Sequence, residues 1–288
     1  MGNPNSKVAF VRMRFAEFRV RALGVSLGML LCALAAARVG PQNPPRAPLP
    51  FENGEELVYS AEFSRALLRG VDVGEFRFSS VSENISRGPD QVAVVHLTGD
   101  VVSKGLFPRI AGFHFHQHIE STADLTPFTT LRTVRSEEQG KRQRELEGVF
   151  DHVAHKAVWT ERRPNQQTTS VDFSEPIQDV LTAIYYLRTR ELAPGASFEI
   201  PLSDSGRMYH ITVAVKESKE MNTAVGHVRT IRIEPGLFGD NAPVRTRGEL
   251  SIWLTDDERR LPVRAQLKLD IGTFDIKLKQ VNSPNRPN

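Results

Sequence analysis

The chain has 288 residues, of which 40% are hydrophobic and 25% charged, an ordinary balance for a folded protein with a sizeable core. Its net charge is +3. Residues 1–37 hold five Lys and Arg against one Glu, a net of +4, which leaves about −1 for residues 38–288. A nearly neutral main part gives no electrostatic reason to expect nucleic acid as a partner.

The start of the chain has the pattern of an export signal. A basic stretch ending at Arg21 precedes an apolar run over residues 22–37, which closes with three alanines. Sixteen residues are short for a membrane-spanning helix, which needs about 20. We expect residues 1–37 to be a signal segment of an exported, periplasmic or envelope-associated protein. The alternatives are an uncleaved anchor, which would be the chain's only membrane contact, and a buried helix.

The lone cysteine, Cys32, lies in this apolar run, so a chain cleaved after about Ala37 has no disulfide. Residues 38–50 contain five prolines and predict an extended linker or an unstructured terminus. We expect a single β-rich domain over residues 51–283 and a short tail at 284–288. A pair of domains divided near residue 175 is the alternative.

Period-two alternation of apolar and polar residues dominates the rest of the chain. It is clearest near the C-terminus, where one apolar set ends at Ile271 and a second runs through Phe274, Ile276 and Leu278. Such alternation indicates antiparallel strands with one buried face. Ile211 to Val215 and Leu250 to Leu254 have the same pattern, and further strands are expected at about 92–102, 110–119, 128–135, 143–151, 154–160 and 228–234.

One segment, at about residues 177–188, has helical spacing instead. Ser174 is the expected N-cap and Pro176 suits the first turn. About a dozen strands and one helix predict a mostly β fold, a curved antiparallel sheet or open barrel with the helix covering its apolar face.

Several segments resemble the bacterial family known as domain of unknown function 3108. They are residues 51–59, 70–75, 178–188, 192–195 and 223–226, and above all the run Trp-Leu-Thr-Asp-Asp-Glu-Arg-Arg-Leu-Pro-Val at 253–263. The resemblance covers nearly all of residues 51–281. It implies an exported β protein and transfers no catalytic residue.

The histidines His114, His116 and His118 alternate along a predicted strand and would share one face. Three imidazoles suggest zinc. However, the outer two would be about 13 Å apart in an extended strand, too far to meet easily at one ion. We therefore read them as a solvent-exposed face and keep a metal-dependent envelope hydrolase as an alternative function.

A charged run, from Asp256 and Asp257 to Arg259 and Arg260, separates two alternating segments by the length of a hairpin turn. We interpret it as a structural turn that could also serve recognition. The pair Glu55-Glu56 reads as a solvated face or loop. No nucleotide-binding, nucleophile-elbow or zinc-protease motif occurs in the sequence.

These patterns favour a non-enzymatic module that binds or carries an apolar ligand, a lipid or a peptide segment, without a cofactor. The expected ligand-binding residues are the apolar-face side chains Phe76, Phe78, Leu267, Leu269 and Ile276. The other alternative is a structural adaptor that binds another envelope protein through a sheet edge.

Overall fold

The computed structural model describes residues 49–87, 90–105, 114–163 and 165–284, so the signal segment and most of the linker lie outside the described residues. Residues 48–288 form one compact unit. In chain order the elements are β1 (Glu55–Arg65), β2 (Leu68–Arg87), β3 (Asp90–Ser103), β4 (Phe115–Leu125), β5 (Phe128–Gln139), β6 (Arg142–Asp151), β7 (Lys156–Arg163), β8 (Gln167–Asp172), α2 (Val180–Thr189), β9 (Ser197–Asp204), β10 (Arg207–Thr223), β11 (Gly226–Pro235), β12 (Gly248–Thr255), β13 (Pro262–Leu269) and β14 (Gly272–Asn282).

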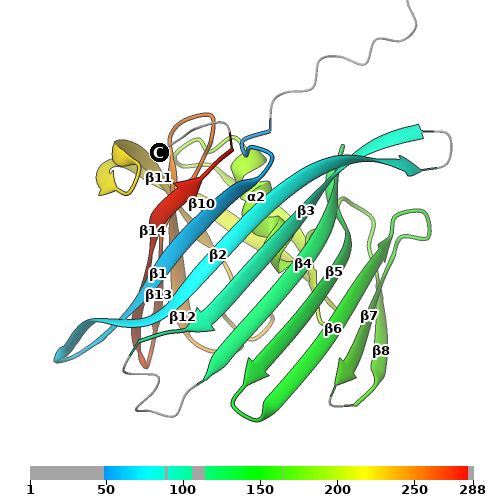
Figure 1. Ribbon diagram of the computed structural model, residues 1–288, viewed down its shortest axis with the longest axis horizontal. Coiled ribbons are helices and arrows are strands. Elements are labelled where there is room, and N and C mark those ends of the chain that lie inside the picture. The colour runs from blue at the N-terminus through cyan, green and yellow to red at the C-terminus, as the bar shows by residue number, and fades with distance from the viewer. Residues whose placement is uncertain (1–48, 88–89, 106–113, 164, 285–288) are drawn as a thin grey trace, which may run out of the picture. The chain divides into compact units, whose positions relative to one another are not determined.

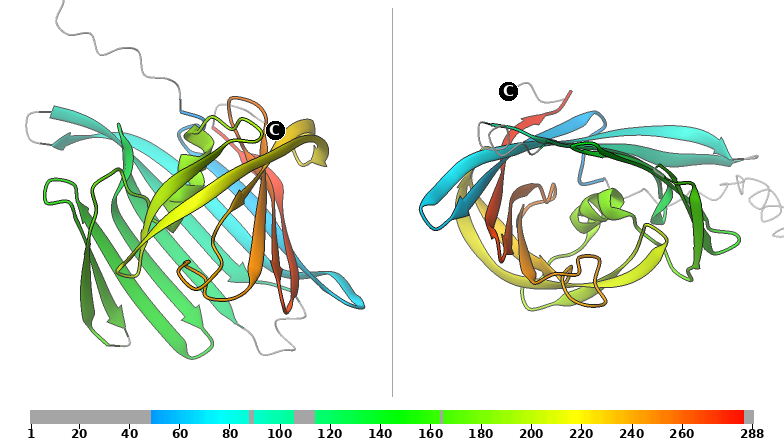
Figure 2. Two further views of the ribbon diagram at one scale, coloured as in Figure 1. Left: turned by 180° about the vertical axis from the view of Figure 1, so that it is seen from behind. Right: turned by 90° about the horizontal axis from the view of Figure 1, so that it is seen from below.

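All fourteen strands belong to one antiparallel sheet, in the order β8-β7-β6-β5-β4-β3-β2-β1-β14-β13-β12-β11-β10-β9. Each strand pairs with its neighbours in the chain, except that β8 and β9 do not pair with each other, and β1 also pairs with β14. The first and last strands are thus joined, and the open edges are β8 and β9 in the middle of the sequence. The sheet curls into an open barrel around α2, as predicted (Figures 1 and 2).

The segment before α2 bridges the barrel across its open side. Thr130 of β5 donates its N–H to the Ile177 carbonyl, and the Gln178 N–H donates to the Pro201 carbonyl of β9, both at 2.9 Å. Ser203 donates its N–H back to the Gln178 carbonyl at 2.9 Å. Residues 177–178 therefore act as a short extended link between strands that are not neighbours in the sheet.

This link corrects the predicted start of the helix. The backbone at residues 177–178 is extended because it bonds to β5 and β9, so α2 begins at Val180 instead of near residue 177. Asp179, not Ser174, is the N-cap. Its side chain accepts hydrogen bonds from Leu181 N and Thr182 N at 2.6 and 2.9 Å, which satisfies two of the free N–H groups of the first turn.

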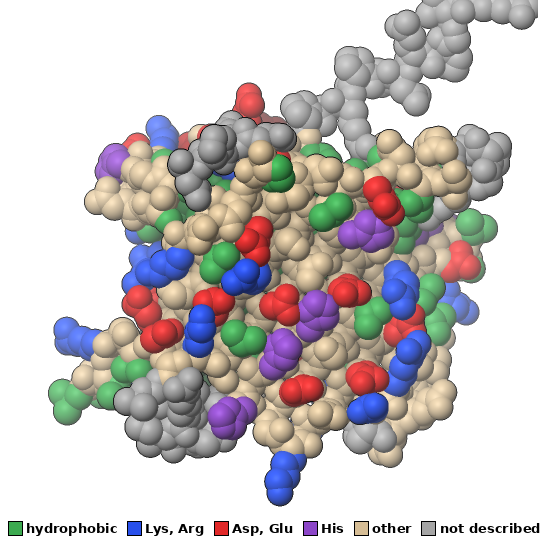
Figure 3. All heavy atoms as spheres, in the orientation of Figure 1, with side chains coloured by type: hydrophobic (Ala, Val, Ile, Leu, Met, Phe, Trp, Pro, Cys, Tyr) green, Lys and Arg blue, Asp and Glu red, His purple; other side chains and the backbone are tan. Residues whose placement is uncertain are grey.

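Alternation places the core inside the curve of the sheet. In β1, buried Leu57, Tyr59 and Ala61 alternate with partly exposed neighbours, most of which are polar. The helix contributes Leu181, Tyr185 and Leu187 to the same interior. The outer face of the sheet is a mixture of acidic, basic and histidine side chains (Figure 3).

Antiparallel pairing sorts the turns between two ends of the barrel. The β1–β2, β11–β12 and β13–β14 turns lie at one end, which we call the first-hairpin end. The β6–β7 and β12–β13 turns lie at the other, which we call the opposite end. The C-terminus of α2 reaches the opposite end, because Arg188 contacts Glu55 and Arg259 there.

Candidate binding cavity

A cavity of about 420 Å³ lies between α2 and the concave face of the sheet. Its volume falls in the range of small-molecule sites. Strands from both halves of the chain and the loop after β11 contribute to its wall. The lining residues are Tyr59, Phe76, Phe78, Val180, Ala183, Ile184, Leu187, Ile200, Leu202, Asp204, Ile211, Val213, Pro235, Leu237, Pro243, Val244, Leu250, Ile252, Leu254, Pro262, Arg264, Ala265 and Ile276.

Only two of these lining residues are charged, and both are held in ion pairs. Asp204 pairs with Arg135 of β5 at 3.0 Å, and Arg264 pairs with Asp275 at 2.6 Å while lying over the Trp253 ring. The hydroxyl of Tyr59 donates to the Pro262 carbonyl at 2.8 Å. The wall is therefore apolar, and its few polar groups already have partners.

Three of the five predicted ligand-binding residues line this cavity, namely Phe76, Phe78 and Ile276. Leu267 and Leu269 do not. They lie further along β13 toward the first-hairpin end, where Leu267 pairs with Phe274, and both are half-buried.

Sequence reasoning missed most of the wall. The contribution of β9 was missed because no strand was predicted there. The helix was expected on the apolar face, but the residues that it adds to the cavity wall were not identified. The alternating sets Ile211 to Val215 and Leu250 to Leu254 were visible as strands, but nothing in the sequence indicated that they face Phe76 across a cavity.

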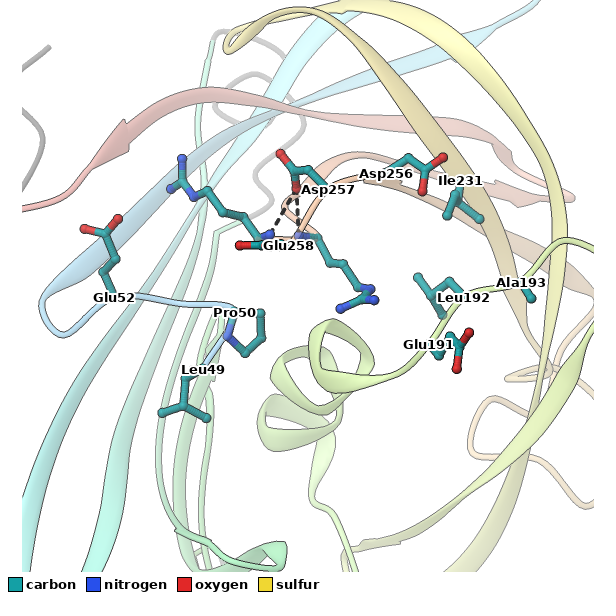
Figure 4. A pocket seen from close by; sticks show the side chains of 12 residues that line it. Leu49, Pro50, Glu52, Glu191, Leu192, Ala193, Ile231, Asp256, Asp257 and Glu258 are labelled. Atoms are coloured by element: carbon teal, nitrogen blue, oxygen red, sulfur yellow. Dashed lines mark hydrogen bonds between the residues drawn. The ribbon is translucent and has the colours of Figure 1, made fainter. Parts of the chain in front are cut away.

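The opposite end of the barrel has a hollow of a different kind, about 730 Å³ in volume and mostly polar (Figure 4). The predicted recognition turn forms one side of it, with Asp256, Asp257, Arg259 and Arg260 among the lining residues. The start of the domain at residues 49–52 and the chain after α2 form the remainder. The turn reading is confirmed, because residues 256–261 connect β12 to β13.

Asp257 holds this turn together. Its carboxylate accepts hydrogen bonds from Thr255 Oγ1 at 2.6 Å and from the N–H groups of Arg259 and Arg260 at 3.1 Å each (Figure 4). These bonds fix a turn in which Arg260 has a positive φ of 43°. The same turn directs the Arg259 side chain toward the interior, where its guanidinium donates to the Glu55 carboxylate at 3.3 Å.

Glu55 corrects another sequence interpretation, since it is 0% exposed and not a solvated surface residue. It forms an ion pair at 2.5 Å with Arg188 of α2, which is 1% exposed. Arg188 also donates to the carbonyls of Pro50 and Arg259 at 2.7 and 3.2 Å, and it lies over the rings of Phe51 and Tyr185. Three of the segments that carry the family resemblance, residues 51–59, 178–188 and 253–263, meet at this ion pair.

The predicted histidine strand lies on the outer face of the sheet. Nδ1 of His118 is 2.7 Å from Asp100 and its Nε2 is 3.2 Å from Glu120, while His116 is 3.7 Å from Asp100 and His114 is exposed. Partial burial lowers the pKa of His118, but the hydrogen bonds to Asp100 and Glu120 outweigh it and raise the pKa.

Within the residues that the structure describes, no three or more His, Cys, Asp or Glu side chains are grouped so that they could hold a metal ion. Across the same residues, no helix has the length and apolar character needed to cross a membrane.

The family model "Protein of unknown function (DUF3108)" matches residues 58–279. The chain belongs to this family. The expected resemblance is thereby confirmed over most of the domain. No curated protein matches the chain.

Several solved structures are similar to the chain at low sequence identity. A β-barrel-like protein of domain of unknown function DUF1849 from Brucella abortus has a TM-score of 0.50 at 11% identity, covering 81% of this chain and 99% of its own. A provisionally assigned exported protein with a YmcC-like fold from Bacteroides fragilis has a TM-score of 0.34 at 8% identity, covering 82% and 98%. A provisionally assigned lipoprotein from Parabacteroides distasonis has a TM-score of 0.31 at 8% identity, covering 82% and 100%. The first supports the fold of this DUF3108 chain and says nothing of its ligand.

Proposed function

We propose that this DUF3108 protein is an exported, non-enzymatic binding or carrier module that holds an apolar chain, such as the acyl chain of a lipid, in the cavity beneath α2. The observation that carries the proposal is the cavity itself, about 420 Å³ in volume with an almost wholly apolar wall. Export is inferred from the basic and apolar pattern of residues 1–37.

The size of the cavity argues for a guest. Protein interiors are close-packed, so an apolar space of about 420 Å³ beside the core leaves the side chains that line it without van der Waals partners on one side. An apolar guest would restore the missing van der Waals contacts, whereas water would find almost no free hydrogen-bonding partner on this wall.

The cavity wall also favours an apolar acyl chain over a charged or polar ligand. Asp204 and Arg264 already pair with Arg135 and Asp275, so neither offers an unmatched charge to a ligand inside the cavity. An acyl chain needs only apolar contact. The aromatic rings of Tyr59, Phe76 and Phe78 on one side and the aliphatic face of α2 on the other would provide it.

The test is displacement of an environment-sensitive dye by fatty acids of increasing length. Wild-type protein should bind the dye saturably and release it to a long-chain acid. The variant that fills the cavity, Ala183→Leu with Ala265→Leu, should lose binding while remaining folded by circular dichroism, because both alanines line the wall.

Ala154→Leu is the matched control, since Ala154 is exposed in the β6–β7 turn and is not among the residues that line the cavity. It should bind the dye like wild type. Absence of saturable dye binding in wild type, or equal binding in the filled variant, would refute the proposal.

The adaptor alternative has one observation in its favour. β8 is an open edge of the sheet, and five of its six residues are exposed. Five of the six side chains from Gln167 to Asp172 are polar, the exception being Val171, so β8 is a weaker template for strand addition than a hydrophobic edge would be. The hydrolase alternative has less support, because His116 and His118 lie outside the barrel, where His118 is hydrogen-bonded to Asp100 and His116 is 3.7 Å from the same carboxylate.

A further inference from the structure

The tip of the β1–β2 hairpin carries the most exposed large apolar side chain of the described residues. Leu67 is 100% exposed and Leu68 is 45% exposed. The tip extends beyond the body of the barrel, at the lower left of Figure 1. Single exposed apolar residues are common on protein surfaces. Here two adjacent leucines are exposed together at a protruding tip, which makes a small apolar patch.

The backbone holds the leucines outward. Ala66 adopts a positive φ of 48°, a conformation that costs a residue with a side chain about 1 kcal/mol or more. The hydroxyl of Ser64 accepts a hydrogen bond from Gly70 N at 3.0 Å, across the base of the tip. The hydrogen bond and the turn conformation together fix the tip, so the leucine side chains stay exposed to solvent.

Two arginines flank the leucines. Arg65 and Arg69 are both exposed, and among the described residues neither forms an ion pair. In the space-filling view, hydrophobic and basic side chains share this protrusion (Figure 3). Leucines that enter an interface between arginines that remain at head-group level are typical of peptides that bind membrane surfaces.

A second turn extends the same apolar surface. β14 pairs with β1 so that Thr273 faces Ser64, which places the β13–β14 turn beside the tip. Ile271 in that turn is 55% exposed, while its neighbour Asp270 is acidic. Both turns lie at the first-hairpin end, together with the loop after β11 that supplies Leu237, Pro243 and Val244 to the cavity wall.

We propose that the β1–β2 tip, residues 64–70, is a membrane-contacting element that inserts Leu67 and Leu68 into the interface of a bilayer containing anionic lipids. Two unpaired arginines complement anionic head groups, and the tip is convex, which suits a deformable lipid surface. The inference stands on the exposure and charge of the tip alone and does not require that the cavity bind a ligand. It departs from the expectation that only the N-terminal segment contacts membranes.

The test places a tryptophan at the tip of the full chain. Leu67→Trp should blue-shift its emission, and brominated lipids should quench it, when vesicles of phosphatidylethanolamine and phosphatidylglycerol are added. Val153→Trp is the matched control, because Val153 is 93% exposed in the β6–β7 turn at the opposite end. It should stay in water even if the N-terminal segment tethers the chain, and both variants share the background of buried Trp159 and Trp253.

Charge and salt supply the second part of the test. Each of Arg65→Gln and Arg69→Gln should weaken the response to anionic vesicles about fivefold, as expected for one basic residue near a charged surface, and added salt should weaken it further. Purely zwitterionic vesicles should give a smaller response.

The proposal is overturned if Leu67→Trp remains solvent-exposed on anionic vesicles, or if Val153→Trp responds equally. It is also overturned if Leu67→Asp removes an envelope protein from the purified material while the vesicles leave the tip probe unchanged, because the tip would then be a protein-docking element. Dye displacement in vesicle-free solution reports on the cavity separately, and Leu67→Asp should leave it unchanged.

Discussion

Glu55 and Arg188 are the residues that join three distant segments at the opposite end of the barrel. Their ion pair is almost wholly shielded from water, and Arg259 adds a second contact to Glu55 at 3.3 Å. Breaking such a pair leaves one buried group uncompensated, which typically costs 3–5 kcal/mol.

We expect Glu55→Gln and Arg188→Met each to lower the free energy of unfolding by about 3–5 kcal/mol, measured by urea denaturation. Glu249→Gln is the control, because it removes an exposed ion pair with Lys268 and should cost about 1 kcal/mol or less. Equal losses for Glu55→Gln and Glu249→Gln would show that the buried pair has no special role.

Asp179 makes the stability of the fold depend on pH, and the shift of its pKa gives the sign of that dependence. Burial raises the pKa of Asp179 to about 6 in the folded protein, although N–H groups of α2 donate to its carboxylate. The unfolded value is near 3.8. The folded state therefore binds a proton that the unfolded state does not bind between these values, so this group destabilises the fold above pH 6 and the cost is relieved as the pH falls toward 4.

Asp179→Asn removes this contribution, and its amide oxygen can still accept the cap hydrogen bonds. We expect wild type to gain stability relative to Asp179→Asn as the pH falls. The unfolding free energy of Asp179→Asn minus that of wild type should decrease by up to about 3 kcal/mol between pH 7 and pH 4. Asp151→Asn is a control of opposite sign, because hydrogen bonds from Ala154 N and Val153 N lower the pKa of Asp151. A difference for Asp179→Asn that is independent of pH would contradict this account.

At the scale of elements, the β12–β13 hairpin separates core burial from turn chemistry. Leu254 is 0% exposed and lines the cavity, whereas Asp257 is an exposed residue that stabilises the turn. Leu254→Ala should lower the free energy of unfolding by about 2–5 kcal/mol, and Asp257→Asn or Pro262→Ala by about 1 kcal/mol or less.

Denaturant melts of the three variants check this order. A loss at Asp257→Asn larger than the loss at Leu254→Ala would mean that the turn, through its hold on Arg259, stabilises the barrel more than the core of β12 does.

Strands in which apolar and polar residues alternate regularly could be predicted from the sequence. The two edge strands, which lack this alternation or contain proline, could not. β13 and β14 alternate cleanly and were expected. β8 is an almost entirely polar edge strand and has no apolar face to detect. β9 contains Pro201, which is tolerated because β9 is an edge strand, where a missing N–H need not break the ladder. The Pro201 carbonyl accepts the N–H of Gln178.

The start of α2 shows the same limit. Ser174 and Pro176 favour an early helix start locally, but hydrogen bonds to β5 and β9 hold residues 177–178 extended. Those bonds join positions about 25 to 50 residues apart, so local sequence could not reveal them. The Glu55–Arg188 pair spans 133 positions and was missed for the same reason.

At the scale of the whole molecule, the curl of the sheet determines which residues face one another. The sequence predicted a curved sheet covered by one helix, and it identified Phe76, Phe78 and Ile276 as apolar-face residues. It could not show whether the concave face is filled. The structure places α2 so that a volume of about 420 Å³ remains between the helix and the strands.

The central claim is that an apolar chain occupies this volume. Organic extraction and mass spectrometry of the purified protein, wild type and Ala183→Leu/Ala265→Leu side by side, test it most directly. The account predicts about one lipid or fatty-acid molecule per wild-type chain and a large loss in the filled variant, with Ala154→Leu like wild type. Wild-type protein that yields no lipid and takes up none when offered it, or a filled variant that retains as much as wild type, would contradict the account.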